Sequence, residues 1–246
     1  MCMLFCIPLV CMGQKYTLKT VFDTHGVVWG FDFISKEELL ITLRRGELLY
    51  VHLNKNIQIK LPTPNIAPKG QGGLLDVHYQ KVAGKDYVYL TYSTIYQGQL
   101  TTALARGEWK NQTLQQLQTL FVAKVTGDSA RHFGSRLLFK DQHIYMTIGD
   151  RGERDHAQDL SFHNGKILRL DLDGQAAAAN PFEKDPGSLP EIWSYGHRNP
   201  QGIDLDPVSG KIYSCEFGPR GGDELNLIAS SKNYGWPVIT YGREYW

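Results

Sequence analysis

A glycine-led strand followed by a hairpin recurs four times along the chain, and this repeat limits the possible folds more than any other feature. The four units begin at Gly30, Gly72, Gly134 and Gly202, and each continues through a turn into a second and a third apolar strand. Their spacing is irregular, roughly 40 to 50 residues or longer, as in propeller repeats. The repeat therefore predicts an all-β propeller with about four blades in this chain. A β-sandwich with uneven strands is the alternative.

Short alternating runs separated by turn residues fill the rest of the chain. Residues 86–90 and 143–148 are examples of strand-like runs, and turn dipeptides such as Arg45-Gly46 and Asp173-Gly174 lie between such runs. Helical periodicity is scarce. Residues 113–122 are the best candidate for a helix, but their apolar positions fit a strand equally well.

Length and charge limit the classes of function. The 246 residues fit one large all-β unit or two ordinary domains. The chain has 26 Lys and Arg against 25 Asp and Glu, which excludes a strongly basic nucleic-acid binder. No stretch approaches the roughly 20 apolar residues that a membrane span needs. We therefore expect neither nucleic acid nor a membrane-spanning segment among the features of this protein.

Residues 1–13 form an apolar run about as long as the hydrophobic core of a signal peptide. No basic residue precedes it, so we interpret it as the remnant of an export signal, with a buried first strand as the alternative. Cys2, Cys6 and Cys11 lie in this run, and their spacing matches structural zinc sites poorly. Residues 14–246 would then form a partial propeller domain whose one cysteine is Cys215.

The residues just ahead of the leading glycines carry polar groups from which a site can be built. In a propeller the first strand of each blade lines the central channel, so these residues gather at one channel mouth. They are Gln71, His132 and Gln201, with Arg198 and Asn199 just upstream of Gln201. An imidazole, a guanidinium and three amides suit a planar, anionic, carbonyl-rich ligand together with a hydroxylated substrate.

Two residues of this ring have the chemistry of reactive groups. His132 is the natural proton acceptor, because imidazoles titrate near neutral pH; a histidine that only caps backbone groups is the alternative. Arg198 lies two residues before Pro200, which biases Asn199 toward an extended conformation. A guanidinium held there would suit carboxylates or quinone oxygens, whereas a solvated surface turn is the alternative.

The loop at residues 216–224 has three glycines and a proline, which expose main-chain carbonyls beside acidic groups. Hard cations such as calcium take such oxygen ligands, although the loop is not an EF-hand. The sequence contains no P-loop, no His-Glu-x-x-His and no Gly-x-Ser-x-Gly motif, and residues 70–73 do not fit the dinucleotide fingerprint.

Several motifs, taken together and in order, resemble those of the soluble pyrroloquinoline quinone (PQQ)-dependent sugar dehydrogenases of the aldose or glucose/sorbosone dehydrogenase type. The resemblance runs from about Val28 to Tyr245. The motifs are QGGLLD (71–76), RHFGSRL (131–137), IGDRG (148–152), AQDL (157–160), GKILRL (165–170), WSYGHRNPQG (193–202), GPRGGDELN (218–226) and NYGWP (233–237).

The resemblance implies a six-bladed propeller of which this truncated chain supplies about four blades. It implies a periplasmic or secreted enzyme that oxidises the anomeric hydroxyl of aldoses to lactones and passes electrons to an external acceptor. His132 would be the general base, while hydride passes to PQQ. Asp150 would orient His132, and Arg198 would stabilise negative charge on the quinone oxygen.

The resemblance also implies the contacts of two cofactors, PQQ and calcium. The PQQ contacts would be Gln71, Arg198, Asn199, Gln201 and Tyr245. The calcium ligands would be the carbonyls of Gly218 and Pro219, with Glu224 and the Tyr234 carbonyl at a further site. The family's remaining blades would add basic residues that hold the PQQ carboxylates.

Two other functions are compatible with the same residues. A propeller can bind a ligand or a protein partner without catalysis, because a fold alone does not determine function. A calcium-dependent lactonase, in which His132 activates water, is the third reading.

Overall fold

The computed structural model describes residues 16–55, 57–243 and 245. The run at residues 1–13, with Cys2, Cys6 and Cys11, lies outside the described residues, so the expected export-signal remnant and its boundary stay predictions. Within the described ranges, no helix is long and apolar enough to cross a membrane.

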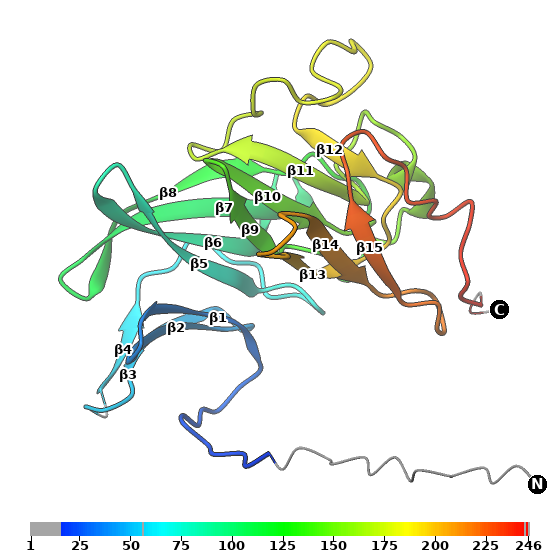
Figure 1. Cartoon of the computed structure of the whole chain (residues 1–246). Coiled ribbons are helices and arrows are strands. Elements are labelled where there is room, and N and C mark those ends of the chain that lie inside the picture. Colours follow the sequence, from blue (N-terminus) through cyan, green and yellow to red (C-terminus); the bar gives the residue numbers. More distant parts are fainter. Residues whose placement is uncertain (1–15, 56, 244, 246) are drawn as a thin grey trace, which may run out of the picture.

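Four antiparallel sheets follow one another along the chain, each with its strands in sequence order (Figure 1). The first contains β1 (Val28–Ser35), β2 (Glu38–Leu43), β3 (Glu47–His52) and β4 (Ile57–Leu61). The second contains β5 (Leu74–Val82), β6 (Lys85–Tyr96), β7 (Gln99–Lys110) and β8 (Thr113–Val122). The third contains β9 (Leu137–Lys140), β10 (His143–Ile148), β11 (Lys166–Asp171) and β12 (Ile192–Tyr195), with the short 3₁₀ helix η1 (Arg154–Ala157) before β11. The fourth contains β13 (Pro200–Leu205), β14 (Ile212–Glu216) and β15 (Glu224–Ile228).

These sheets are the blades of a propeller, and they confirm the fold predicted from the repeat. The leading glycines lie in or just before the first strand of each sheet: Gly30 in β1, Gly72 before β5, Gly134 before β9 and Gly202 in β13. The first three sheets have a fourth strand that the repeat did not reveal. Residues 113–122 form strand β8 rather than a helix, because they pair along β7.

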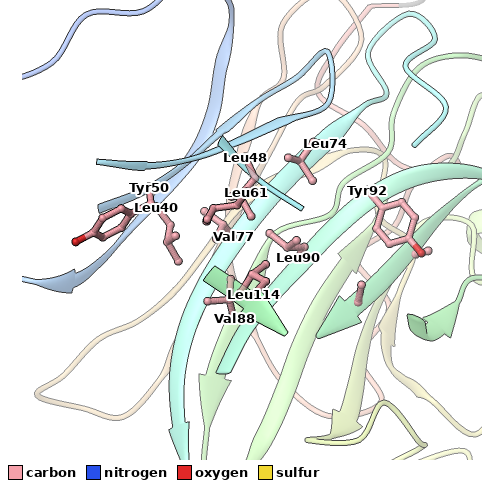
Figure 2. Close-up of a cluster of buried hydrophobic side chains, with 12 residues drawn as sticks. Leu40, Leu48, Tyr50, Leu61, Leu74, Val77, Val88, Leu90, Tyr92 and Leu114 are labelled. Carbon is pink, nitrogen blue, oxygen red and sulfur yellow. The ribbon is translucent and has the colours of Figure 1, made fainter. Parts of the chain in front are cut away.

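The hydrophobic core lies between successive blades. Leu40 and Leu48 of the first blade form one buried cluster with Val77 and Leu90 of the second (Figure 2). Similar clusters join the second blade to the third and the third to the fourth. Fully burying such a side chain contributes about 1.5–3 kcal/mol, so these shared clusters stabilise each blade against its neighbours.

A buried threonine also joins each blade to the next, and we call this contact the threonine link. On the second strand of three blades, a fully buried threonine accepts a hydrogen bond from a backbone N–H of its own first strand or of the turn leading into it, and its hydroxyl reaches a carbonyl of the next blade. The threonines are Thr42, Thr91 and Thr147, and the respective carbonyls are those of Leu75, Ser135 and Pro200. Because a buried hydroxyl must be paired, the link fixes how successive blades sit against each other.

A second polar connection runs from the second blade through the third to the fourth. Asp76 Oδ2 accepts the backbone N–H of Leu137 at 2.9 Å, and Asp76 Oδ1 lies 3.2 Å from Arg136 Nη1. Burial raises the pKa of the Asp76 carboxyl, and the nearby Arg136 opposes that shift. Arg136 Nε donates in turn to the Gln201 carbonyl at 2.9 Å. The starts of the last two blades are therefore held together near the residues of the predicted site.

The threonine link gives a testable prediction for stability. Thr91→Val keeps the shape of the side chain but removes the bonds to Ser135 and Asp76, so we expect the free energy of unfolding to fall by about 2 kcal/mol. Thr113→Val, on the partly exposed start of β8, should cost less than about 0.5 kcal/mol. Urea unfolding measures both. Equal losses in the two variants would show that the link adds no net stability.

Candidate active site

A cavity of about 340 Å³ lies at one end of the blades, where loops from the third and fourth blades meet. When two neighbouring strands are antiparallel, the first begins at the end of the blade where the second finishes. His132 precedes β9 and Asp150 follows β10, so both lie at the same end of the third blade. Arg198, which precedes β13, lies there as well. All three line the cavity with Trp236 and Tyr245.

His132 is held in place from two sides. Its backbone N–H donates to Gln71 Oε1 at 2.8 Å, and its Nδ1 lies 2.7 Å from Asp150 Oδ1. The backbone of His132 is left-handed, with φ of 53°, a conformation that costs free energy for a residue other than glycine and is found at functional sites. Gly149 permits this turn, because a Cβ there would lie 2.1 Å from the His132 carbonyl oxygen.

Asp150 is the centre of the hydrogen bonds around the cavity. Its Oδ1 also accepts the backbone N–H of Gly152 at 2.8 Å, and its Oδ2 accepts the indole Nε1–H of Trp236 at 2.8 Å. The residue is 1% exposed, and these donors satisfy a carboxylate that would otherwise be costly to bury. Because a carboxylate only accepts hydrogen bonds, the contact assigns a hydrogen to His132 Nδ1 and leaves Nε2 as the acceptor nitrogen of a neutral imidazole.

Arg198 lines the same cavity as His132 and is connected to it through Asp150. Its carbonyl accepts the backbone N–H of Asp150 at 2.8 Å. Its Nη1 donates to the carbonyls of Phe217 and Gly218, and its guanidinium carbon lies 5.3 Å from the centre of the Trp236 ring. Its Nε is buried without a partner in the part of the chain that the structure describes.

The three amide residues of the predicted ring lie beside the His132 loop and bond to it or to one another. Gln71 receives the His132 N–H. Asn199 Oδ1 accepts the Gly134 N–H at 3.2 Å, and Gln201 Nε2 donates to Asn199 Oδ1 at 3.1 Å and to the Gly134 carbonyl at 3.2 Å. The structure thus places all three next to the His132 loop, whose backbone they hold, but not among the residues that line the cavity. Their contact with PQQ stays a prediction.

The predicted calcium ligands are divided between two places. Pro219 lines the cavity, whereas Gly218 and Glu224 line a much smaller pocket behind Arg198. Glu224 Oε2 accepts a bond from Asn226, and the Tyr234 ring stacks on His197 at 4.6 Å between ring centres. Among the described residues, no three His, Cys, Asp or Glu side chains form a cluster that could hold a metal ion. Calcium would therefore depend on main-chain carbonyls, and these ligands stay predictions.

Trp236 and Arg154 belong to the site, although the sequence did not reveal their contacts. The Trp236 indole bonds to Asp150, and the Arg154 guanidinium lies 5.1 Å from the centre of the same indole. Arg131 also lines the cavity. With Arg198, three guanidinium groups surround one cavity and favour an anionic ligand. Trp236 stands in the motif NYGWP, which is part of the family resemblance, but the motif indicates no partner for its indole.

Lys166 anchors the loop that carries Arg154. Its fully buried Nζ donates to the carbonyls of His156, Ala157 and Asn164 at 2.8, 3.1 and 2.7 Å. Burial lowers the pKa of Lys166 to about 7. The loop that includes η1 is therefore held through its main-chain carbonyls by the Lys166 amine, whose charge depends on pH.

The sequence profile of the glucose/sorbosone dehydrogenase family matches residues 25–246. The chain belongs to this family. It is 38% identical over 88% of its length to an uncharacterized protein from Synechocystis, of whose length it spans 58%. It is 35% identical over 98% of its length to aldose sugar dehydrogenase YliI from Escherichia coli, and spans 69% of that protein.

A solved structure supports the same assignment. The PQQ-bound form of aldose sugar dehydrogenase from Streptomyces coelicolor matches with a TM-score of 0.79 and 31% identity, over 90% of this chain and 66% of that chain. These findings confirm the family that the sequence motifs indicated. The cavity just described is thus the candidate active site of a glucose/sorbosone dehydrogenase family member.

The bond between Trp236 and Asp150 gives a second prediction. Trp236→Phe removes a donor from a buried carboxylate, so we expect the free energy of unfolding to fall by about 2 kcal/mol. Trp193→Phe is a matched control, because the indole Nε1 of Trp193 is buried without a partner among the described residues. Its removal should cost clearly less, as measured by urea unfolding. A loss in Trp193→Phe as large as in Trp236→Phe would contradict the assignment.

The buried amine of Lys166 gives a third prediction. Above pH 7 the native amine releases its proton, whereas in the unfolded chain it keeps the proton up to its ordinary pKa of 10.5. The unfolded state then binds more protons, so stability rises with pH in this window. Between pH 7 and 9 the free energy of unfolding should rise by about 2 kcal/mol more in the wild type than in Lys166→Met. If the free energies of unfolding of the wild type and Lys166→Met changed equally with pH, the prediction would be wrong.

Proposed function

We propose that this chain supplies the proton-accepting residues of a PQQ-dependent dehydrogenase that oxidises aldoses at the anomeric hydroxyl to lactones. The observation that carries the proposal is the His132–Asp150 pair, which lies in a cavity lined by Arg198 and two other guanidinium groups. The family and its PQQ-bound member support it.

The residues of the cavity fit PQQ, which is a planar, aromatic quinone with three carboxylates. Trp236 and Tyr245 offer aromatic faces, and Arg131, Arg154 and Arg198 offer donors for carboxylate and quinone oxygens. The unpaired, buried Nε of Arg198 is a donor that an oxygen of such a ligand would satisfy. These side chains would hold the cofactor.

The residues of this chain supply the proton chemistry. His132 Nε2 would accept the proton of the anomeric hydroxyl, and Asp150 would stabilise the resulting imidazolium through the 2.7 Å contact with Nδ1. Trp236 and Gly152 hold the Asp150 carboxylate so that it does not rotate away from the imidazole. Arg198 would donate to an oxygen on which negative charge develops. When bound, PQQ supplies the acceptor for the hydride of the anomeric carbon.

Calcium would be held by the carbonyls of Gly218 and Pro219, with Glu224 and the Tyr234 carbonyl at a further site. The Gly218 carbonyl accepts a bond from Arg198 Nη1 at 3.2 Å, and a guanidinium at this distance repels a bare cation. We therefore propose that calcium binds there together with the anionic cofactor. An external acceptor would reoxidise PQQ, and the apolar run at residues 1–13 supports a periplasmic or secreted location.

His132→Asn tests the proposed general base. Asparagine tolerates the left-handed backbone at this position but accepts no proton, so kcat for aldose-dependent dye reduction with PQQ and calcium should fall at least about 100-fold. His143→Asn, at the start of β10, is the control and should keep its activity. PQQ affinity, measured by calorimetry, should change little in either variant.

Three results would decide against the proposal. Full activity in His132→Asn would remove the mechanism. PQQ binding by the wild type without any sugar oxidation would favour a propeller that only binds its ligand. Hydrolysis of lactones without a redox cofactor would favour a lactonase.

A further inference from the structure

A second buried histidine–carboxylate pair is bonded to the backbone of Arg198. His197 Nδ1 and Glu216 Oε1 are 2.9 Å apart, and the two side chains are 0% and 5% exposed. Glu216 is the last residue of β14, and His197 lies in the connection between β12 and β13. Neither residue lines the cavity, so the proposed proton chemistry does not use this pair.

The other atoms of this pair are bonded as well. Ser194 Oγ lies 2.9 Å from His197 Nε2, and Asn226 Nδ2 donates to Glu216 Oε1 at 3.1 Å. The Tyr234 ring stacks on the imidazole. A serine, a histidine and a carboxylate in a row have the order of a hydrolase triad. However, Ser194 is fully buried, so a substrate cannot reach its hydroxyl and the row has a positional role.

Glu216 and the two residues after it bind Arg198 through both its backbone and its side chain. Glu216 Oε2 accepts the Arg198 backbone N–H at 2.6 Å. Arg198 Nη1 donates to the carbonyl of Phe217 at 2.9 Å and to that of Gly218 at 3.2 Å. A single stretch of three residues therefore binds Arg198 at its backbone N–H and at Nη1.

This arrangement fixes which part of the guanidinium can meet a ligand. Nη1 is occupied by the two carbonyls, and Nε is buried without a partner among the residues that the structure describes. Trp236 lies against the guanidinium, 5.3 Å from its carbon, which further limits its rotation. An oxygen of a bound ligand would pair with the remaining donors.

We propose that Glu216 and His197 are positioning residues, which hold Arg198 so that its unpaired donors meet an oxygen of the cofactor. This inference rests on the proposed function. A carboxylate is required at residue 216 because it accepts from three donors, namely the His197 ring, the Arg198 backbone and the Asn226 amide. A glutamine would place its own N–H against one of these donors.

Glu216→Gln tests the proposal against a matched control in the same chain. The control is Glu191→Gln, because Glu191 Oε2 and His163 Nε2 form another histidine–carboxylate pair, 3.2 Å apart, whose side chains are 21% and 3% exposed and do not line the cavity. Two readouts are compared: the PQQ dissociation constant by calorimetry, and hydrogen exchange of the Arg198 backbone amide without ligand. In Glu216→Gln we expect PQQ affinity to fall roughly tenfold or more, with faster Arg198 exchange. Glu191→Gln should change neither.

The outcomes separate this inference from the proposed function. If the wild type binds PQQ and Glu216→Gln binds it equally well, the positioning role is wrong. If the wild type does not bind PQQ, the proposed function fails, and Arg198 amide exchange alone decides the positioning role. Should Glu216→Gln fail to fold, His197→Gln, which keeps an N–H donor, and His197→Leu, which does not, replace it. PQQ affinity should be kept in the first and lost in the second, and equal affinity in both would overturn the proposal.

Discussion

The threonine links are the interaction on which the rest of this structure depends. Each one places a fully buried hydroxyl between two blades, where it needs a partner and bonds to a carbonyl of the next blade. Apolar contacts between blades supply most of the stabilising free energy, but they do not specify direction. The hydrogen bond of the threonine hydroxyl is directional, so it determines how the first strands of successive blades are aligned. Loops from different blades reach the same end of the molecule as a result.

The residues at that end divide into those that face the cavity and those that support them. Gln71, Asn199 and Gln201 bond to the backbone around His132 or to each other. The cavity wall is formed instead by His132 and by aromatic and guanidinium side chains. An imidazole and a guanidinium placed by such supports lose less conformational entropy when a ligand binds. Much of the polar sequence at this end thus serves to hold two reactive groups.

The sequence predicted the blades well because each blade has a recognisable local pattern. A leading glycine and two alternating runs lie within a few residues of each other. The fourth strands β4 and β12 were missed, because they are short and follow connections of variable length. The convergence of His132, Gln71 and Arg198 followed from the repeat, whereas the pairing of His132 with Asp150 came from the family resemblance. The bond from Trp236 to Asp150 spans 86 positions, and no periodic pattern in a single sequence reports such a contact.

The left-handed backbone at His132 has a consequence for how this site can change during evolution. A φ of 53° disfavours most side chains and is tolerated best by glycine, asparagine and aspartate. Substitutions to branched or bulky residues would disturb the turn before they altered any chemistry. We therefore expect that homologues without the imidazole carry one of these few small residues at this position. Such homologues would keep the fold but lose the proton acceptor.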